Sequence, residues 1–469
     1  MILKAYRRAV SPRGSGADIA LPKGKRMKRT SLRITVIALA VIVSTGVTLA
    51  QTQNCHLPGG TVNLAPTADA DVNQGVILTT FVGGSTVQVL LATQSLTDLT
   101  HKFSYCPTNP FVFTRVIPGT NEFMGFSTNQ IAQTLNIGTG NTVSTVASIT
   151  VAQINQQLKD KGLQLSLDDV NHESVTIPGG LTALISHNEK IVACSEYPTQ
   201  CTGYPAHQTD VDILGDAVLV LDSSGNVVWV WDAFTCPNCS TVLPVSRAAI
   251  LGELCVKMQD SRACPLQLAP IANDWLHSNS INYDPSDGNL VVSIRSQDWV
   301  IKLAYQDGQG DGHIVWRLGK EGDFTMLNTP GIQFPWFSHQ HDAQVWREAP
   351  TPGTLSLFDN GNTRKALLDP LATSRGQVLV INEAPTVMTA DILFNAILPT
   401  YADAYGTAQL LNNGNWWFWG GHILYKGQHV SQGFEYTPAE QLVYRVTYNR
   451  ASYRSNRFTT IAPFMPSPQ

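Results

Sequence analysis

The residues of this chain that could do chemistry are histidines and arginines gathered between positions 273 and 422. His277 lies in His-Ser-Asn-Ser-Ile, and His339 and His341 lie together in Ser-His-Gln-His-Asp-Ala. Histidine can donate a hydrogen bond, accept a proton or attack as a nitrogen nucleophile near neutral pH, and arginine offers a planar fork to anionic oxygens. These side chains predict a site that handles a small anionic group.

Four segments in a fixed order carry a family resemblance. They are Asn273–Ile281, Gly312–Gly319, Ser338–Ala343 and Leu357–Gly361. In this order they resemble the arylsulfotransferase family, over roughly residues 175 to 450. The resemblance implies transfer of a sulfuryl group from an aryl sulfate ester to a phenol through a sulfohistidine, with neither a nucleotide-activated donor nor a cofactor. By analogy with phosphoryl transfer, such a reaction depends mostly on positioning and on neutralising charge on the peripheral oxygens.

The resemblance also implies roles for individual residues. His277 and His341 would be the two histidines that bind sulfate, with Arg364 as the arginine that binds it. His422, in Trp-Gly-Gly-His, would take the sulfuryl group covalently, and His207 is the alternative nucleophile.

Neighbouring residues predict further contacts with substrate. Asn279 and His339 each lie two positions from a sulfate-binding histidine, so on a strand they would share its face. Arg295 alternates within an apolar strand and is a second candidate cation. The predicted partners are small aryl sulfates and phenols.

A metal site is the main chemical alternative. A His-x-His pair such as His339 and His341 is also a zinc pattern, but no third ligand stands at a matching spacing. Cys236-Pro-Asn-Cys239 could be a redox or zinc motif, although no second CxxC accompanies it. We therefore assign no metal ligand. A metal-dependent hydrolase or oxidoreductase on a propeller, and a non-catalytic propeller binding module, stay as alternative functions because a fold does not fix a function.

The N-terminus predicts export. A basic cluster at residues 28 to 33 precedes the apolar run Ile34–Ala50, which predicts a signal peptide over residues 1 to 50, with Met27 as an alternative start. Without these residues the chain holds 21 basic and 34 acidic residues, a net charge of −13. Such a charge argues against nucleic acid as a partner. We expect a periplasmic or secreted protein with no stable membrane anchor.

All eight cysteines follow the predicted signal peptide, which is typical of disulfides in an oxidising compartment. Spacing favours the pairs Cys194 with Cys201, Cys236 with Cys239 and Cys255 with Cys264, which leaves Cys55 with Cys106. Spacing alone does not determine connectivity.

Short apolar runs separated by Gly, Pro, Asn and Asp predict an all-β chain. We expect a small β-rich domain over residues 51 to 172, with a helix from Val151 to Lys161, and a second domain over residues 173 to 469. In the second, Gly225–Trp229 is echoed 87 residues later by Gly312–Trp316, which fits a separation of two propeller blades of about 40 to 45 residues each. Evenly spaced strands would also suit a sandwich. The family resemblance favours a propeller and implies six blades with the site at the central channel.

Overall fold

Frequent turn residues divide this chain into short strands. The computed structural model describes residues 57–64, 75–81, 89–93, 96–107, 109, 111–139, 142–202, 209–235, 243–257, 264–329, 331–347, 349–384, 386–458 and 460. In these segments it contains six β-sheets and only two α-helices. The prediction of an all-β chain is therefore confirmed.

Three of the sheets come from the first part of the chain. The first contains β5 (Phe111–Val116), β6 (Glu122–Ser127), β7 (Ile131–Ile137) and β8 (Val143–Thr150). The second contains β9 (Asn171–Ile177), β10 (Leu181–Ala193), β11 (Asp210–Leu221), β12 (Val227–Asp232), β13 (Leu254–Val256) and β14 (Ile271–Asp274). The third contains β15 (Ser278–Asp284), β16 (Asn289–Ile294), β17 (Trp299–Leu303) and β18 (Ile314–Gly319).

The other three sheets include the C-terminal strands. One contains β19 (Phe324–Leu327), β20 (His341–Trp346), β21 (Thr354–Asp359), β22 (Arg375–Asn382) and β23 (Met388–Ile397). The next contains β24 (Ala402–Ala404), β25 (Thr407–Leu410), β26 (Trp416–Tyr425), β27 (Gln428–Tyr436), β28 (Leu442–Tyr448) and β1 (Gly60–Leu64). The last contains β2 (Val76–Phe81), β3 (Val89–Thr93), β4 (His101–Tyr105) and β29 (Ser452–Phe458).

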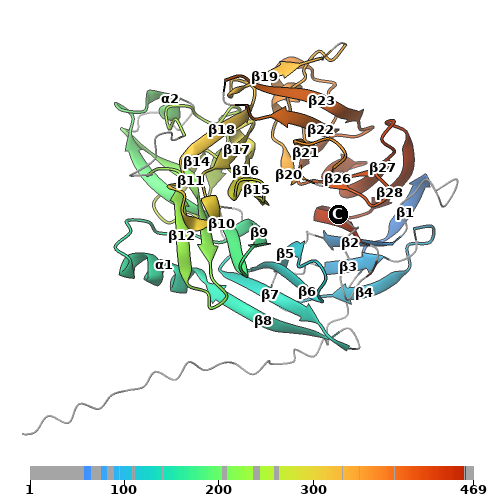
Figure 1. Ribbon diagram of the computed structural model, residues 1–469, viewed down its shortest axis with the longest axis horizontal. Helices are drawn as coiled ribbons and strands as arrows, with labels where there is room; N and C mark the ends of the chain where they lie inside the picture. The colour runs from blue at the N-terminus through green and yellow to red at the C-terminus, as the bar shows by residue number, and fades with distance from the viewer. Residues whose placement is uncertain are drawn as a thin grey trace, which may run out of the picture. The chain divides into compact units, whose positions relative to one another are not determined.

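One strand of each sheet contacts its counterparts in the two neighbouring sheets. Among the described strands, β5 contacts β9, β9 contacts β15, β15 contacts β20, β20 contacts β25, β25 contacts β29, and β29 contacts β5. Within Gly46–Gln469, which form one compact unit, the sheets therefore surround a common centre (Figure 1). Residues at the ends of these six strands can meet there although they lie far apart in the sequence.

N-terminal strands pair with C-terminal strands. β1 pairs with β28, and β2 pairs with β29, both antiparallel. The first strands of the predicted N-terminal domain are thus hydrogen-bonded to strands from the end of the chain. Because both ends share two sheets, the ring of contacts is held closed by backbone hydrogen bonds.

The helix predicted from Val151 is confirmed. α1 (Val151–Asp160) begins after Thr150, whose hydroxyl accepts from the backbone N–H of Gln153 while the Gln153 side chain accepts from Thr150 in return. Val151, Ile154 and Leu158 form its buried face. α2 (Pro198–Cys201) is a single turn.

The two similar sequence segments, Gly225–Trp229 and Gly312–Trp316, are closer in the fold than predicted. Gly225–Trp229 enters β12 and Gly312–Trp316 enters β18, and these strands belong to successive sheets. The prediction of a two-blade separation is wrong. The spacing is long because β13 and β14 are added to the earlier sheet after β12.

Two of the predicted disulfides are confirmed. Cys194 is bonded to Cys201, and Cys255 is bonded to Cys264. Cys106 is also disulfide-bonded, while Cys55 and the Cys236-x-x-Cys239 segment lie outside the described residues.

No helix in the part of the chain that the structure describes is long and apolar enough to cross a membrane.

Three carboxyl groups lie close together at the second sheet: Glu189 on β10, Asp212 on β11 and Asp168 in the segment that precedes β9. The register of β10 and β11 pairs Glu189 with Leu214 and Ile191 with Asp212, so Glu189 and Asp212 lie on the same face of the sheet. Burial, followed by the interaction with Glu189, raises the pKa of Asp212 to about 8. Burial and the charge of Glu189 raise the pKa of Asp168 to about 8 as well.

We expect the melting temperature to fall as the pH rises from about 5 to about 8, and this contribution to level off above about pH 8. Asp168 and Asp212 hold protons in the folded chain up to about pH 8, whereas carboxyl groups of the unfolded chain lose them near about pH 4. The folded state then binds more protons than the unfolded state, so raising the pH through this interval lowers the free energy of unfolding. Each such proton changes that energy by about 1.4 kcal/mol per pH unit. Thermal denaturation in a pH series measures the slope.

The diagnostic variant is Asp212→Asn, which removes one titrating group and should make the decrease in melting temperature up to about pH 8 shallower. Asp210→Asn, at an exposed position of the same strand, is the matched control and should keep the original slope. An unchanged slope for Asp212→Asn would contradict the assignment.

Candidate active site

Three histidines stand at the starts of three neighbouring strands. His172 is the second residue of β9, His277 directly precedes β15, and His341 is the first residue of β20. β15 lies against both β9 and β20. The rings of His172 and His277 have centroids 4.7 Å apart, and the charges of His277 and His341 both act on His172. The three imidazoles therefore form one cluster.

Backbone strain accompanies this arrangement. His172 and His277 both adopt φ of 54°, a left-handed conformation that is uncommon for residues other than glycine. Such outliers persist where the surrounding structure holds them and are frequent at functional sites. His277 is left-handed and lies before β15, so the strand alternation that predicted a shared face for His277 and Asn279 does not apply.

His172 is a neutral imidazole. Tyr453 Oη donates to the backbone oxygen of His172 at 3.1 Å, so the contact of 3.0 Å between Tyr453 Oη and His172 Nδ1 is donated by the ring. Burial, then the charges of His277, His187 and His341, hold the pKa of His172 well below its usual range. Nε2 is then the unprotonated nitrogen.

His341 has the same protonation state for a related reason. Its Nδ1 lies 2.7 Å from Asn360 Oδ1, while the Asn360 amide nitrogen donates to the backbone oxygens of Ala402 and Tyr405. The amide oxygen therefore accepts from Nδ1–H of His341. Burial and the charge of Arg295 hold the pKa of His341 well below its usual range. Its Nε2 keeps a lone pair for attack or for proton transfer.

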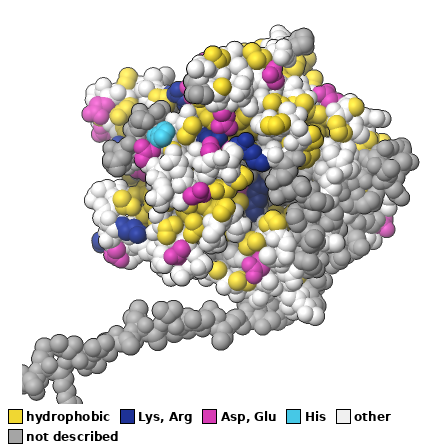
Figure 2. Space-filling view, viewed as in Figure 1, with side chains coloured by type: hydrophobic (Ala, Val, Ile, Leu, Met, Phe, Trp, Pro, Cys, Tyr) yellow, Lys and Arg dark blue, Asp and Glu magenta, His cyan; other side chains and the backbone are white. Residues whose placement is uncertain are grey.

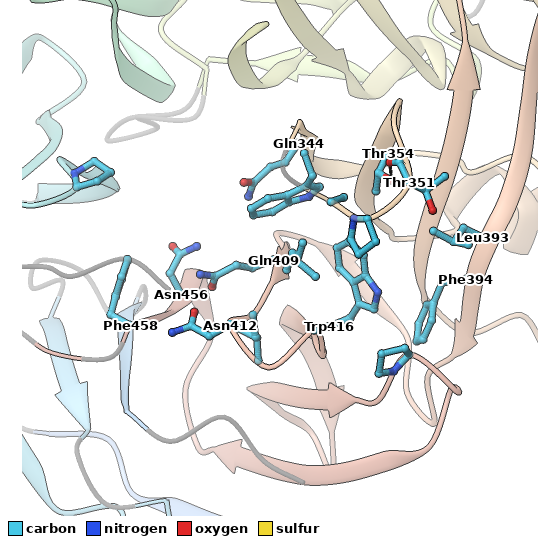
Figure 3. A pocket seen from close by; sticks show the side chains of 18 of the residues that line it. Gln344, Thr351, Thr354, Leu393, Phe394, Gln409, Asn412, Trp416, Asn456 and Phe458 are labelled. Carbon is cyan, nitrogen blue, oxygen red and sulfur yellow. Dashed lines mark hydrogen bonds between the residues drawn. The ribbon is translucent and has the colours of Figure 1, made fainter. Parts of the chain in front are cut away.

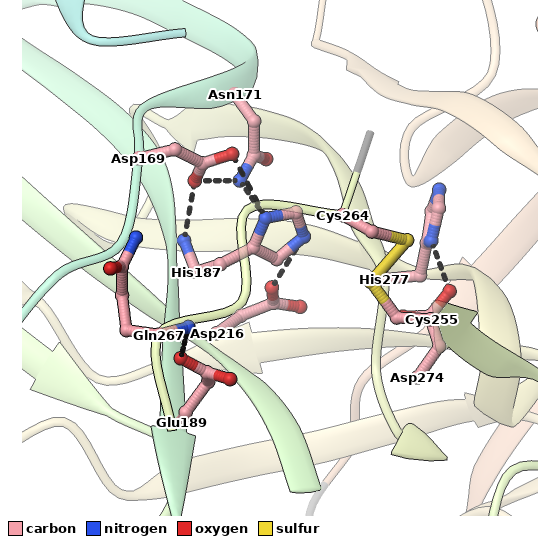
Figure 4. The surroundings of a disulfide bond; sticks show 10 residues. All are labelled: Asp169, Asn171, His187, Glu189, Asp216, Cys255, Cys264, Gln267, Asp274 and His277. Carbon is pink, nitrogen blue, oxygen red and sulfur yellow. Dashed lines mark hydrogen bonds and ion pairs between the residues drawn. A yellow bond between two sulfur atoms is a disulfide. The ribbon is translucent and has the colours of Figure 1, made fainter. Parts of the chain in front are cut away.

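His277 differs because a carboxylate supports it. Its Nδ1 lies 2.6 Å from Asp274 Oδ2 (Figure 4). Burial opposes ionisation of Asp274, but the charge and hydrogen bond of His277 lower the pKa of this carboxyl to about 2. A carboxylate behind an imidazole fixes the tautomer and stabilises the protonated ring, which suits a general acid or base.

A second buried histidine supports the His277 segment from behind. His187 lies 3.1 Å from Asp169 Oδ2 and 3.7 Å from Asp216 Oδ1 (Figure 4). Burial opposes its charge, but these carboxylates raise the pKa of His187 to about 10. Asp216 also accepts from the backbone N–H of Ser278 at 2.7 Å, so this ion pair fixes the chain next to His277.

Arg295 is the cation of the cluster. It begins the 3-10 turn η2 (Arg295–Gln297), and its backbone N–H donates to the carbonyl of His277 at 3.3 Å. Among the described residues, no hydrogen bond or ion pair engages its guanidinium. Its charge lowers the pKa of His341. Figure 2 shows basic side chains gathered near the hollowed centre of one face.

Arg364, the arginine predicted to bind sulfate, is engaged elsewhere. It is buried and lies 2.9 Å from Asp359 Oδ2, and it also donates to the backbone oxygen of Thr373. Arg375 contacts the same Asp359 oxygen at 2.7 Å. Arg364 therefore helps to neutralise a buried carboxylate, which leaves Arg295 as the better candidate for an anionic substrate.

Asn279 and His339 have their polar atoms directed at protein partners. Asn279 is fully buried and its amide donates to the backbone oxygen of Gln340 at 2.7 Å. His339 is fully buried, with Nδ1 2.8 Å from Asp298 and Nε2 bonded to Glu253. Because both ring nitrogens of His339 have partners, it does not form a zinc pair with His341. No group of His, Cys, Asp and Glu within the described segments is placed to hold a metal ion.

His422 lies outside the three-histidine cluster. It is 27% exposed, its Nδ1 lies 2.6 Å from Asp403, and its ring stacks on His429 at 3.8 Å. Ring contacts lead from His422 through Tyr405 and Tyr453 to His172. The alternative nucleophile, His207, lies outside the described residues.

The sequence predictions missed His172, which the structure places in the cluster. One signal could have found it. His172-Glu173 and His341-Asp342 are both histidine-acid pairs at the start of a strand, and in both pairs the acid joins the same ion-pair network with Arg454.

A separate cavity of about 640 Å³ contains none of these histidines. It is lined by amides and aromatic rings, including Gln344, Gln409, Asn456 and Trp416 (Figure 3). Its lining supplies one charged side chain, Arg115, whose guanidinium is bonded to Glu173 and Asp342. The cavity therefore lacks the free cation and nucleophile that the histidine cluster combines.

Comparison with solved structures gives only distant likenesses. Sqt1 of Saccharomyces cerevisiae matches with a TM-score of 0.37 and 6% identity, covering 82% of this chain and 86% of that chain. The WD40 domain of Toxoplasma gondii coronin matches with a TM-score of 0.33 and 8% identity, covering 85% and 75%. Neither likeness is close enough to assign a fold.

Sequence comparison is more informative. The chain is 28% identical over 251 residues to arylsulfate sulfotransferase AssT of Escherichia coli O6:H1 (strain CFT073), a match that covers 45% of this chain and 37% of that protein. The chain thus matches well under half the length of this curated relative. The model of the arylsulfotransferase (ASST) family matches residues 141–455. Because this match spans more than half of the sequence and includes the whole histidine cluster and Arg295, the chain belongs to the arylsulfotransferase (ASST) family.

Proposed function

We propose that this protein is an exported arylsulfate sulfotransferase on a six-bladed β-propeller. Six sheets whose inner strands contact one another in a closed sequence support the propeller. The family membership supports transfer of a sulfuryl group from an aryl sulfate to a phenol. The two disulfides described above support an oxidising compartment such as the periplasm.

One observation carries the assignment of the site. A neutral imidazole, His341, lies beside Arg295, a guanidinium with no carboxylate partner among the described side chains. A nucleophile that is unprotonated and a cation that is free to bind oxygens are the two groups that sulfuryl transfer through a covalent intermediate requires.

The first half-reaction then runs through His341. Its Nε2 attacks the sulfur of the aryl sulfate, the nitrogen–sulfur bond forms, and the bond from sulfur to the aryl oxygen breaks. Arg295 neutralises charge on the peripheral sulfuryl oxygens. The leaving aryl oxygen takes a proton from His277, whose imidazolium Asp274 stabilises.

The second half-reaction reverses these roles. A phenol binds where the leaving group departed, and His277 accepts its proton because a phenol has a pKa near about 10 and is a weak nucleophile when protonated. The phenoxide oxygen attacks sulfur, and the bond to His341 breaks. The aryl sulfate product leaves and His341 is again neutral.

A chromogenic aryl sulfate tests the function directly. Release of the chromogenic phenol should require a second phenol as acceptor and should produce the acceptor's sulfate ester. Release at the same rate without any acceptor would identify a sulfatase, and no release with or without a phenol would remove the proposed function.

We expect His341→Ala to abolish covalent labelling by the donor, because it removes the attacking nitrogen. His422→Ala, at the position that the family resemblance predicted as nucleophile, should label normally. Mass spectrometry of protein quenched before acceptor is added measures the acid-labile sulfohistidine and its position. A label on His422 or His172 would show that the nucleophile is misassigned even if the transferase activity survives.

Replacing Arg295 and replacing Arg364 should have different effects, the first on catalysis and the second on stability. Arg295→Ala should lower kcat/KM by about 10²-fold, as loss of one charge-stabilising donor often does. Arg364→Ala should mainly lower the melting temperature, because it removes part of the ion pair that neutralises buried Asp359. Steady-state kinetics and thermal denaturation of both variants separate these effects. Equal kcat/KM for Arg295→Ala and the unchanged protein would reject Arg295 as a sulfuryl-binding residue.

Export makes a separate prediction. Residues 1 to 50 lie outside the described residues, and their basic and apolar order predicts cleavage after Ala50. N-terminal sequencing of exported protein should begin at Gln51. A membrane-bound product that retains Met1 or Met27 would be the opposite outcome.

A further inference from the structure

His339 is joined by its ring to two carboxylates on two other segments. Nδ1 lies 2.8 Å from Asp298 Oδ1 and Nε2 is bonded to Glu253 Oε1. The side chain is fully buried. Both carboxylates accept hydrogen bonds, so the ring donates from both nitrogens and is an imidazolium. Burying a cation and two anions costs desolvation free energy, so this arrangement is weak evidence for a purely stabilising role.

The Asp298 side of this contact leads to Arg295. Asp298 closes the turn that Arg295 begins, and its backbone N–H donates to the Arg295 carbonyl at 3.2 Å. The backbone N–H of His339 donates to the same Asp298 oxygen at 2.7 Å. Gln340 Nε2 donates to the backbone oxygens of Ile294 and Trp299, which flank the turn. The His339-Gln340 dipeptide therefore fixes the Arg295 turn at both ends.

The Glu253 side leads to His277. The backbone carbonyl of Glu253 accepts from the N–H of Asp274 at 3.0 Å, and Asp274 holds the His277 ring. Glu253 lies two residues before Cys255, which the disulfide to Cys264 anchors. A single imidazolium thus links the segment of Asp274, the turn of Arg295 and the strand that begins at His341.

We propose that His339 is a positioning residue of this enzyme, which sets the Arg295 guanidinium against His341 by holding Asp298 and Glu253 together. This inference rests on the proposed function for its role in sulfuryl transfer. The position of the Arg295 guanidinium can be tested separately, because the binding of an anion by Arg295 can be measured without turnover. His339 itself does not touch the sulfuryl group.

His339→Gln tests the proposal with inorganic sulfate as the probe. Glutamine can replace one hydrogen bond and cannot carry the charge, so the Arg295 turn should shift. Misplacement by about 1 Å can cost about 10²-fold in rate, and we expect a loss of that order in kcat/KM together with weaker sulfate binding by calorimetry. The covalent label should still form on His341, only more slowly.

The matched control is His313→Gln. His313 also pairs with an aspartate, Asp311 at 2.6 Å, but it is 32% exposed and lies outside the cluster. This variant should keep the sulfate affinity and kcat/KM of the unchanged protein. Folded His339→Gln protein with the original sulfate affinity would overturn the proposal, as would a sulfuryl label on His339.

Glu253→Gln keeps the proposal testable if His339→Gln does not fold. The charged groups that face His339 are Asp298, Glu253 and Arg295. Burial lowers the pKa of His339, the hydrogen bonds to Asp298 and Glu253 raise it, and the net direction is upward. Removing the Glu253 charge should therefore move the alkaline loss of sulfate binding to lower pH. An unchanged pH profile would count against the proposal, whereas absence of aryl sulfate turnover with normal sulfate binding would count only against the proposed function.

Discussion

A buried network of two arginines and two carboxylates joins the strands that carry the candidate site. Arg115 contacts Glu173 at 3.1 Å and Asp342 at 2.9 Å, and Arg454 contacts the same two carboxylates. These residues belong to β5, β9, β20 and β29. Removing one partner from such a network leaves an uncompensated buried charge, which typically costs several kcal/mol. The network therefore fixes the relative positions of four sheets at their common centre.

The histidines depend on this network because each neighbours one of its carboxylates in the sequence. Glu173 and Asp342 are both fully buried, and they direct the adjacent His172 and His341 into the cluster. Both carboxylates pair with arginines. They therefore do not act as hydrogen-bond partners that would stabilise the protonated form of either imidazole. The positive charge of Arg454 reaches both rings and lowers the pKa of each. Burial is the main cause of the lowered pKa of both rings, and the charge network that holds the fold together acts in the same direction.

The fold class was predictable from turn residues and alternating apolar runs, and the family resemblance located His277 and His341. Contacts between distant segments were not predictable. Arg364 and Arg295 are both arginines close to the family motifs. Only the structure shows that Arg364 pairs with Asp359, whereas Arg295 has no ion-pair partner among the described residues. Strand alternation also failed at the site, because His277 and His339 have positive φ, a backbone feature that a period of two does not anticipate.

The difference between His277 and the other two histidines follows from what stands behind each ring. Asp274 gives His277 a full negative charge, whereas His341 has only the amide oxygen of Asn360 and His172 only the hydroxyl of Tyr453. A carboxylate favours the protonated ring, while a neutral acceptor fixes the tautomer without adding charge. One cluster thus combines an imidazole that is hydrogen-bonded to a carboxylate with two imidazoles that are hydrogen-bonded to neutral groups. Since the three side chains are chemically identical, any difference in their chemistry must come from these supporting residues.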